Sequence, residues 1–260
     1  MSKHALILPA LCLLFALSCK KDSSTTPPVT SNVHLKTGLL LYLPFDGNMA
    51  DSSGNENTTT ANGGATLTYD EHGNSASAFG GTGNGENIIV TNNGSIKFDS
   101  TYTISMDFML RTTSKQVLLS MINYTTGYAP GFQLAVTAPA TSAFGFAAND
   151  STAGCDNYGY AQLNSLSDTT AFIPQPESWY NAICIYHKGS VQVYINGKLV
   201  SSKTGTGTSA LLCPGSQVVI GGWWANDPIS INGKIDEVRL YNRVLNADEI
   251  AELAKNFQDN

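Results

Sequence analysis

The sequence predicts an all-β protein built as a two-sheet antiparallel sandwich or jelly roll, and three observations lead to this class. Charged residues make up only 13% of the 260 residues, against about 25% in an ordinary soluble domain. Hydrophobic residues contribute 42%, enough to bury a core, and 24 glycines supply turns. From Leu39 onward, short apolar runs alternate with clusters of Gly, Asn, Asp and Ser, which is the pattern of strands joined by turns.

The chain begins with a predicted export signal. A basic start precedes an apolar run at 5–17, which is too short to span a bilayer as a helix. The run ends in Ala16-Leu17-Ser18-Cys19, which resembles the lipobox of bacterial lipoproteins. This resemblance implies a lipoprotein signal peptide at 1–18 and a lipid on Cys19. A signal peptide cleaved elsewhere is the alternative.

Residues 19–35 are predicted to form a flexible tether, because their Ser, Thr and Pro residues have little to bury. A Cys-Lys-Lys-Asp start followed by Ser, Thr and Pro is similar to surface lipoproteins of the Bacteroidetes type. The similarity implies an outer-membrane lipoprotein at the cell surface, held to the membrane only through its N-terminal lipid. A periplasm-facing lipoprotein is the alternative.

The remaining chain is expected to fold as one domain over 36–257. The run at 39–45 is apolar on both faces, so we expect loops or a further layer to cover its outer face. The predicted strands lie at 39–45, 88–90, 102–110, 117–122, 131–136, 143–147, 179–186, 191–195, 218–222 and 235–241.

Two local motifs carry sharper predictions. Asn196-Gly197 lies between an alternating run at 191–195 and a polar run at 198–201, which indicates a hairpin with a type I′ turn. Asn246 is followed three residues later by Glu249, with Ile250 and Leu253 at helical spacing. This pattern is a capping box and predicts a short C-terminal helix.

The charge of the chain and its cysteines give further information about its function and its disulfide bonding. The chain has 14 basic and 20 acidic residues, a net charge of −6, and its basic residues are scattered, which argues against nucleic-acid binding. Cys184 lies in an apolar run and is expected in the core. Cys155 and Cys213 lie in turn-rich stretches and are the preferred disulfide pair in an oxidising compartment.

Four segments, in order along 39–253, resemble laminin-G-like, concanavalin A-like jelly rolls. The opening carries Tyr42-Leu43-Pro44-Phe45-Asp46-Gly47 and later Asp51-Ser52-Ser53-Gly54-Asn55, and the centre carries 179–186 with 193–198. The ending carries 233–243 and then the predicted helix. Asn181 departs from the His that the family commonly has there. The resemblance implies two stacked, curved antiparallel sheets, but not a function, because members include sugar binders, adhesive modules and accessory domains of enzymes.

A calcium site is predicted at Asp46 and Asp236. Asp236 shares strand parity with Val238 and Leu240, so we expect its carboxylate to face the core, where it needs a cation or several donors. Asp46 ends the first strand, and carboxylates with loop carbonyls suit Ca²⁺. Many relatives carry a structural Ca²⁺ at matching positions. The alternative is that these carboxylates pair with Arg239 or Arg243, or accept backbone N–H bonds.

A glycan-binding surface is predicted from three aromatic and amide-rich stretches. Sugar rings stack on flat aromatic rings, and amide and carboxylate groups bind their hydroxyls. The alternative is that these rings pack under their own loops. The candidate residues are Trp224 and Tyr158 first, then Tyr160, Asn157, Asn226, Asp227 and Tyr128.

No catalytic motif is found. No Glu has an Asp two residues later, there is no Gly-x-Ser-x-Gly, and His34, His72 and His187 are isolated. An active site formed by two carboxylates from loops distant in the sequence would show no such motif and remains an open alternative.

The sequence therefore predicts a non-catalytic, monomeric, carbohydrate-binding surface lipoprotein that captures polysaccharide or another glycan. One alternative is a protein-binding, adhesive module of the laminin-G type. The other is a diverged glycoside hydrolase or lyase, which would need two carboxylates about 5–10 Å apart in a groove.

Overall fold

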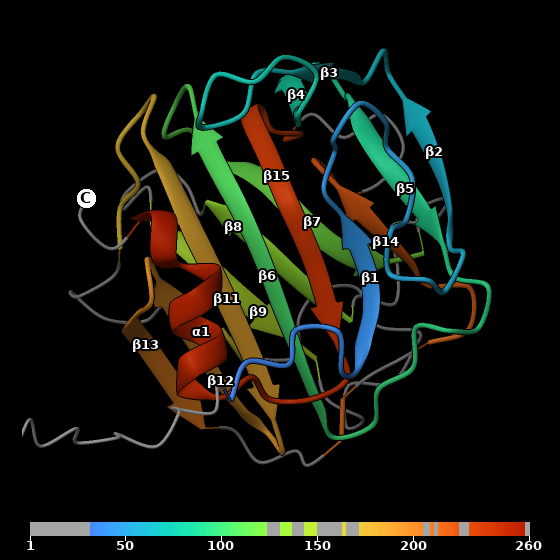
Figure 1. Cartoon of the computed structure of the whole chain (residues 1–260), viewed down its shortest axis with the longest axis vertical. Coiled ribbons are helices and arrows are strands. Elements are labelled where there is room, and N and C mark those ends of the chain that lie inside the picture. The colour runs from blue at the N-terminus through green and yellow to red at the C-terminus, as the bar shows by residue number, and fades with distance from the viewer. Residues whose placement is uncertain are drawn as a thin grey trace, which may run out of the picture. The chain divides into compact units, whose positions relative to one another are not determined.

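Two antiparallel sheets form a sandwich in the computed structural model, which describes residues 32–123, 131–136, 143–149, 163–164, 172–204, 209–210, 213–223 and 229–257 (Figure 1). The first sheet, sheet A, has the order β13 (Lys198–Thr204), β12 (Ser190–Ile195), β11 (Trp179–His187), β6 (Thr101–Leu110), β15 (Asn232–Tyr241), β4 (Ala78–Thr82) and β3 (Thr66–Thr68), and β1 (Leu39–Leu43) also pairs with β15.

Sheet B is the second layer. Its order is β10 (Leu163–Asn164), β9 (Phe144–Ala148), β8 (Phe132–Val136), β7 (Gln116–Ile122), β14 (Gln217–Ile220), β5 (Asn87–Thr91) and β2 (Thr58–Asn62). The C-terminal segment adds α1 (Ala247–Leu253) and a 3₁₀ turn, η1 (Lys255–Phe257). In the part of the chain that is described, no helix is both long and apolar enough to cross a membrane.

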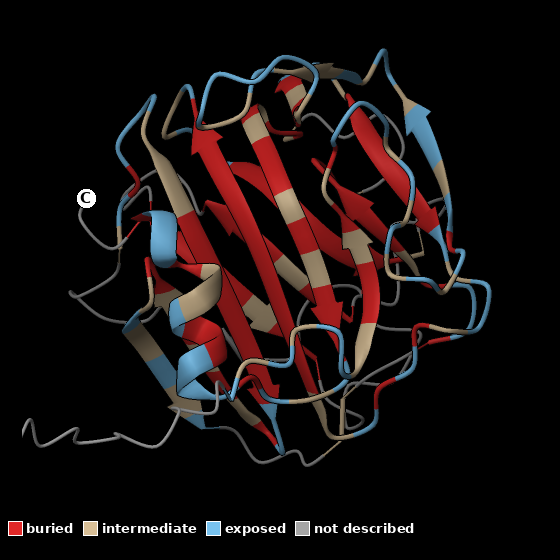
Figure 2. Ribbon diagram, in the orientation of Figure 1, coloured by how far each residue is buried: buried red, intermediate tan, exposed pale blue. Residues whose placement is uncertain are grey.

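The core lies between the two sheets and follows the period of two that strands impose. From β6 of sheet A, Ile104, Met106 and Phe108 belong to one apolar cluster together with Phe132 and Leu134 from β8 of sheet B. The middle strands β6 and β11 are buried along most of their length (Figure 2). The face of β6 and β11 that points away from sheet B is therefore covered as well.

Part of the cover on the outer face of sheet A is α1. Ile183 and Ile185 of β11 form a second apolar cluster with Tyr241, Leu245 and Ile250. The predicted capping box is confirmed: Asn246 accepts a hydrogen bond from Glu249 N–H, and the Glu249 side chain accepts one from Asn246 N–H. This cover lies over β11, and of the first strand only Leu39 packs against the same cluster.

The buried Glu249 carboxylate predicts a pH dependence of stability. It accepts hydrogen bonds from Arg243 at 2.7 and 2.8 Å and from the N–H groups of Asn246 and His34. These bonds, with that from Arg243 the strongest, lower the pKa of Glu249 from 4.5 to about 2. A carboxylate whose pKa is lower in the folded state stabilises the fold above its unfolded pKa, and this contribution disappears as the pH falls from about 4.5 to about 2.

Urea unfolding of the protein and of Glu249→Gln at pH 6 and at pH 3 measures this contribution. The variant should be less stable at pH 6, and the gap between the two proteins should narrow at pH 3. A gap that stays constant between the two pH values would show that the Glu249 carboxylate does not carry this dependence.

The predicted strands are confirmed where their residues are described, and so is the hairpin. Asn196 and Gly197 have φ values of 50° and 76° between β12 and β13, as a type I′ turn requires. The strands β2, β3, β4 and β10 were not predicted. In β4, Gly80-Gly81 resembles a turn, yet a Cβ on Gly81 would lie 2.6 Å from Ile231 Cγ2. Close approach of the backbone, rather than a turn, explains this glycine.

The parity predicted for Asp236 is wrong, because β15 contains a β-bulge. Asp236 pairs with Asp107 and Arg239 pairs with Ser105, so two residues of β15 oppose one residue of β6. Glu237, inside the bulge, has φ 53°. Ile235 and Val238 both point into the core, and the bulge therefore places Asp236 on the outer face of sheet A.

Candidate functional site

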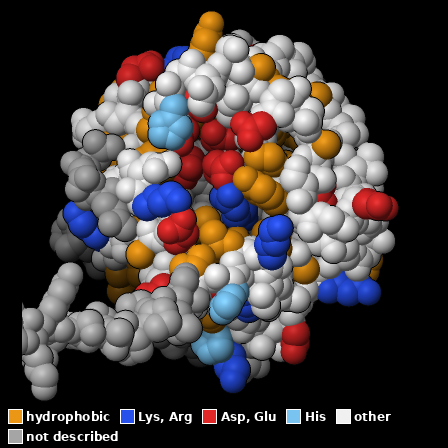
Figure 3. Space-filling model, in the orientation of Figure 1, with side chains coloured by type: hydrophobic (Ala, Val, Ile, Leu, Met, Phe, Trp, Pro, Cys, Tyr) orange, Lys and Arg blue, Asp and Glu red, His pale blue; other side chains and the backbone are white. Residues whose placement is uncertain are grey.

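A cavity of about 340 Å³ on the outer face of sheet A is lined by seven carboxyl side chains. Figure 3 shows the acidic side chains gathered in the middle of this face. We call it the acidic cavity. The charged side chains that line it are the carboxylates Asp46, Asp70, Glu71, Asp107, Asp236, Glu237 and Glu252, with Arg239, Lys255 and His72.

Three of these carboxylates belong to strands of the sheet itself, namely Asp107, Asp236 and Glu237. Asp107 of β6 and Asp236 of β15 are register partners on adjacent strands, and each is only 4% exposed. On the other side of β6, Asn181 of β11 pairs with Asp107 and donates a hydrogen bond from Nδ2 to Asp107 Oδ1 at 2.7 Å. The bulge lets Asp236 Oδ1 accept a hydrogen bond from Glu237 N–H at 2.8 Å.

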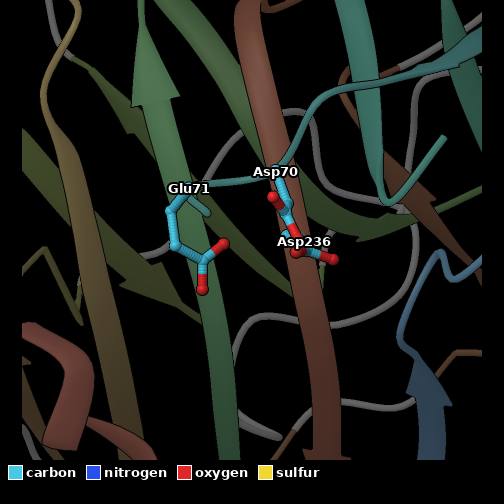
Figure 4. Close-up of side chains that lie close together, drawn as sticks. All are labelled: Asp70, Glu71 and Asp236. Carbon is cyan, nitrogen blue, oxygen red and sulfur yellow. The ribbon is translucent and has the colours of Figure 1, made fainter. Parts of the chain in front are cut away.

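Two further carboxylates, Asp70 and Glu71, come from the loop that follows β3. Asp70 holds this loop in a tight turn, because it accepts hydrogen bonds from His72 N–H and from the backbone and side chain of Asn74. The turn brings Asp70 and Glu71 over the sheet to Asp236, where oxygens of all three side chains lie within 4.8 Å of one another (Figure 4). Glu71 Oε2 is buried and has no hydrogen-bond partner among the described residues.

Burial dominates the electrostatics of this cavity. It raises the pKa of Asp107 to about 8 and that of Asp236 to about 9, and the carboxylates of Glu71 and Glu237 push in the same direction. The pKa of Glu71 is also raised by burial. The opposite holds for Asp70, where the hydrogen bonds from Asn74 and His72 outweigh burial and lower the pKa.

In the described part of the chain, arginine pairs with one carboxylate of the acidic cavity, Glu237. Arg239 forms an ion pair with Glu237 and lies over the Tyr42 ring at 4.1 Å, while Tyr42 donates a hydrogen bond to Glu237 at 3.0 Å. Arg243 pairs with Glu249 instead. Of the alternatives considered for Asp46 and Asp236, only the backbone hydrogen bond to Asp236 is found among the described residues.

The donor set suits a hard divalent cation. Three carboxylates converge, one of their oxygens is buried without a partner, and Ca²⁺ takes six to eight oxygen ligands. The residues present therefore fit the predicted Ca²⁺. The fold brings Asp46 and Asp236 into the same cavity, with Asp46 on its exposed rim.

Five of the seven carboxylates that line the acidic cavity were not predicted as site residues: Asp70, Glu71, Asp107, Glu237 and Glu252. One signal for Asp107 was available, because it is the only charged residue in the otherwise largely apolar run 102–110. Asp70 and Glu71 lie in a turn-like stretch, Asp-Glu-His-Gly-Asn, whose position over the sheet depends on tertiary structure.

The predicted glycan residues lie outside the described part of the chain, as do Cys19 and Cys155. Cys213 is buried and disulfide-bonded, and Cys184 is a free thiol in the core, as predicted. The pairing of Cys155 with Cys213 stays a prediction. The residues outside the described part are Trp224, Tyr158, Tyr160, Asn157, Asn226, Asp227 and Tyr128.

The two packed antiparallel sheets and the short C-terminal helix define a β-sandwich of the jelly-roll class. Residues 82–251 match the family model Laminin_G_3 of the concanavalin A-like lectin/glucanases superfamily. The chain therefore belongs to this superfamily, as its sequence motifs implied. No curated protein matches it in a sequence search.

Solved structures with the same fold include one enzyme domain and several toxin domains. Domain 4 of AbnA, a GH43 extracellular arabinanase from Geobacillus stearothermophilus, was solved with arabinotriose; its TM-score is 0.62 at 17% identity over 83% of this chain and 98% of that chain. The binding domain of Paraclostridial Mosquitocidal Protein 1 gives 0.63 at 18% identity, covering 86% of this chain and 53% of that chain.

The binding domain of botulinum neurotoxin DC, solved with SialylT, gives a TM-score of 0.59 at 16% identity over 86% of this chain and 52% of that chain. The chain thus spans about half the length of the two toxin chains. At these identities the likeness concerns the fold.

Proposed function

We propose that this protein is a non-catalytic carbohydrate-binding surface lipoprotein that captures polysaccharide or another glycan. The observation that carries the proposal is the match to domain 4 of the arabinanase, which spans nearly all of that domain and was solved with arabinotriose. Neurotoxin binding domains with the same fold were solved with SialylT and with N-acetylneuraminic acid. Carbohydrate binding is thus the activity that recurs among domains of this fold.

The N-terminal segment gives the proposal its location. With Cys19 lipidated after removal of 1–18, the part of the 19–35 tether that precedes Asn32 would hold the monomeric domain at the outer membrane, facing the cell exterior or, as the alternative, the periplasm. Asn32 and His34 are hydrogen-bonded to the C-terminal segment of the domain. Such a tether would let the domain reach and bind long polysaccharides. Mass spectrometry of the mature N-terminus, with a diacylated Cys19 as the expected species, tests this part.

We further propose that Ca²⁺ occupies the acidic cavity as a structural ion, held by Asp70, Glu71 and Asp236 with Asp46 at the rim. The convergence of three carboxylates and the unpaired Glu71 Oε2 support this assignment. A divalent cation would offset the repulsion between buried carboxylates. It would also fasten the loop after β3 to β15.

Binding to an array of plant, algal and host polysaccharides tests the proposed function. The protein should be retained by at least one class of glycan in a saturable manner. No detectable binding to any polysaccharide of the array would contradict glycan binding. If pull-downs then recovered protein partners, they would favour the adhesive alternative.

The acidic cavity also favours a second candidate, a diverged glycoside hydrolase or lyase. Glycosidases use two carboxylates with different pKa values, and here carboxylates from the sheet and from a loop share one cavity with raised pKa values at Asp107 and Asp236. New reducing ends released from a bound polysaccharide, and lost in Asp107→Asn, would establish this candidate.

A further inference from the structure

A second cavity, of about 420 Å³, opens on the outer face of sheet A between α1 and the β12–β13 hairpin. We call it the hairpin cavity. In Figure 1, α1 crosses the face that β11 and β12 present. Its size lies within the roughly 300–1,000 Å³ that ligand pockets usually have. Ile185 and Leu245 contribute apolar surface to it, and Val244, which is 40% exposed, adds an apolar rim.

The polar side chains of the hairpin cavity have few hydrogen-bond partners among the described residues. Asn196 is 92% buried in the turn; its Oδ1 accepts a hydrogen bond from Asn181 N–H, but its Nδ2 donates none to any described residue. The side chains of Gln192, Tyr194 and Lys198 likewise make no hydrogen bond within the described part of the chain. The Asn196 amide lines the cavity, and its Nδ2 is available to a hydrogen-bond acceptor on a ligand.

The charge of this cavity is opposite to that of the acidic cavity on the same face. Among the described residues that line it, Lys198 is the only charged one, and none is a carboxylate. The whole chain has a net charge of −6, so the positive charge of this cavity is opposite in sign to that of the chain. A ligand that carries a carboxylate would be attracted here and repelled from the acidic cavity.

We propose that the hairpin cavity binds a sugar residue that carries a carboxylate, a uronic acid unit of an acidic glycan. The Tyr194 ring offers a flat surface for the C–H face of the sugar, Gln192 and Asn196 Nδ2 meet its hydroxyls, and Lys198 meets its carboxylate. This inference rests on the proposed function and names the ligand class and the site. It uses no metal ion.

Calorimetric titration with trigalacturonate and with its uncharged methyl ester tests the inference, with triglucuronate and trimannuronate as further acidic probes. The protein should bind at least one acidic trisaccharide about tenfold more tightly than the corresponding ester, because a charge-assisted hydrogen bond is lost in the ester. Lys198→Met should remove this preference, so that the acid and its ester bind with similar affinity.

Lys203→Met is the matched control, because Lys203 lies on the same strand but does not line the cavity. Equal affinity for acid and ester, or a Lys198→Met variant that behaves like Lys203→Met, would overturn the inference, and so would no binding of any of the three uronates. If the uronates do not bind but the array still retains the protein on neutral polysaccharides, only the inference fails. If no glycan on the array binds the protein, the proposed function fails as well.

Discussion

Addition of Ca²⁺ is expected to raise the melting temperature of the protein, and a chelator to lower it. An ion that binds only the folded state at about 100 times its Kd adds about 2.7 kcal/mol of stability. For a chain of this size that corresponds to roughly 5–11 °C. The physical reason is the buried carboxylate cluster of Asp70, Glu71 and Asp236, whose oxygens lie within 4.8 Å of one another.

The variant Asp236→Asn should abolish this difference. Asn keeps an oxygen that can accept the hydrogen bond from Glu237 N–H but removes the charge that the cation needs. Asp99→Asn is the matched control, because Asp99 is exposed and does not line the acidic cavity. Thermal unfolding of all three proteins with Ca²⁺ and with chelator measures the effect. Identical curves for the unaltered protein in both conditions would refute the calcium site.

Replacement of Phe108 by Ala should cost about 3–5 kcal/mol of unfolding free energy. Phe108 is fully buried on the inner face of β6 and bridges the sandwich, with its ring 5.2 Å from that of Phe144 in sheet B and 5.7 Å from that of Tyr180 in sheet A. The substitution removes apolar contact from both sheets and leaves a cavity between them.

Leu199→Ala serves as the comparison, because Leu199 is 51% exposed on the edge strand β13 and should change stability by about 0.5 kcal/mol or less. Urea unfolding gives both values. Equal, small losses for the two variants would contradict the assignment of Phe108 to the centre of the core.

Most of the fold could be predicted from the sequence, because the motifs that indicate its turns and its helix are local. The capping box at Asn246 and Glu249 and the turn at Asn196-Gly197 each depend on a few neighbouring residues, and the structure contains both. β2 consists of Thr58–Asn62 and lies at the edge of sheet B. Such a polar edge strand has few apolar residues to reveal it.

The site was less predictable, because it depends on tertiary structure. Glu is not a residue that usually adopts a positive φ, so nothing in the sequence announced the bulge at Glu237 that turns Asp236 outward. The acidic cavity also joins Asp107, Asp236 and Glu71 from two strands and a loop. Asp46 and Asp236 could be placed together because the strands that carry or precede them, β1 and β15, pair directly.

The central claim is that the domain binds glycan without cleaving it, and equilibrium binding combined with a reducing-end assay on the same polysaccharide tests it most directly. The account predicts saturable binding to at least one polysaccharide of the array, with no reducing ends formed above the protein-free control after prolonged incubation. Formation of reducing ends that depends on Asp107, or no binding to any polysaccharide, would contradict it.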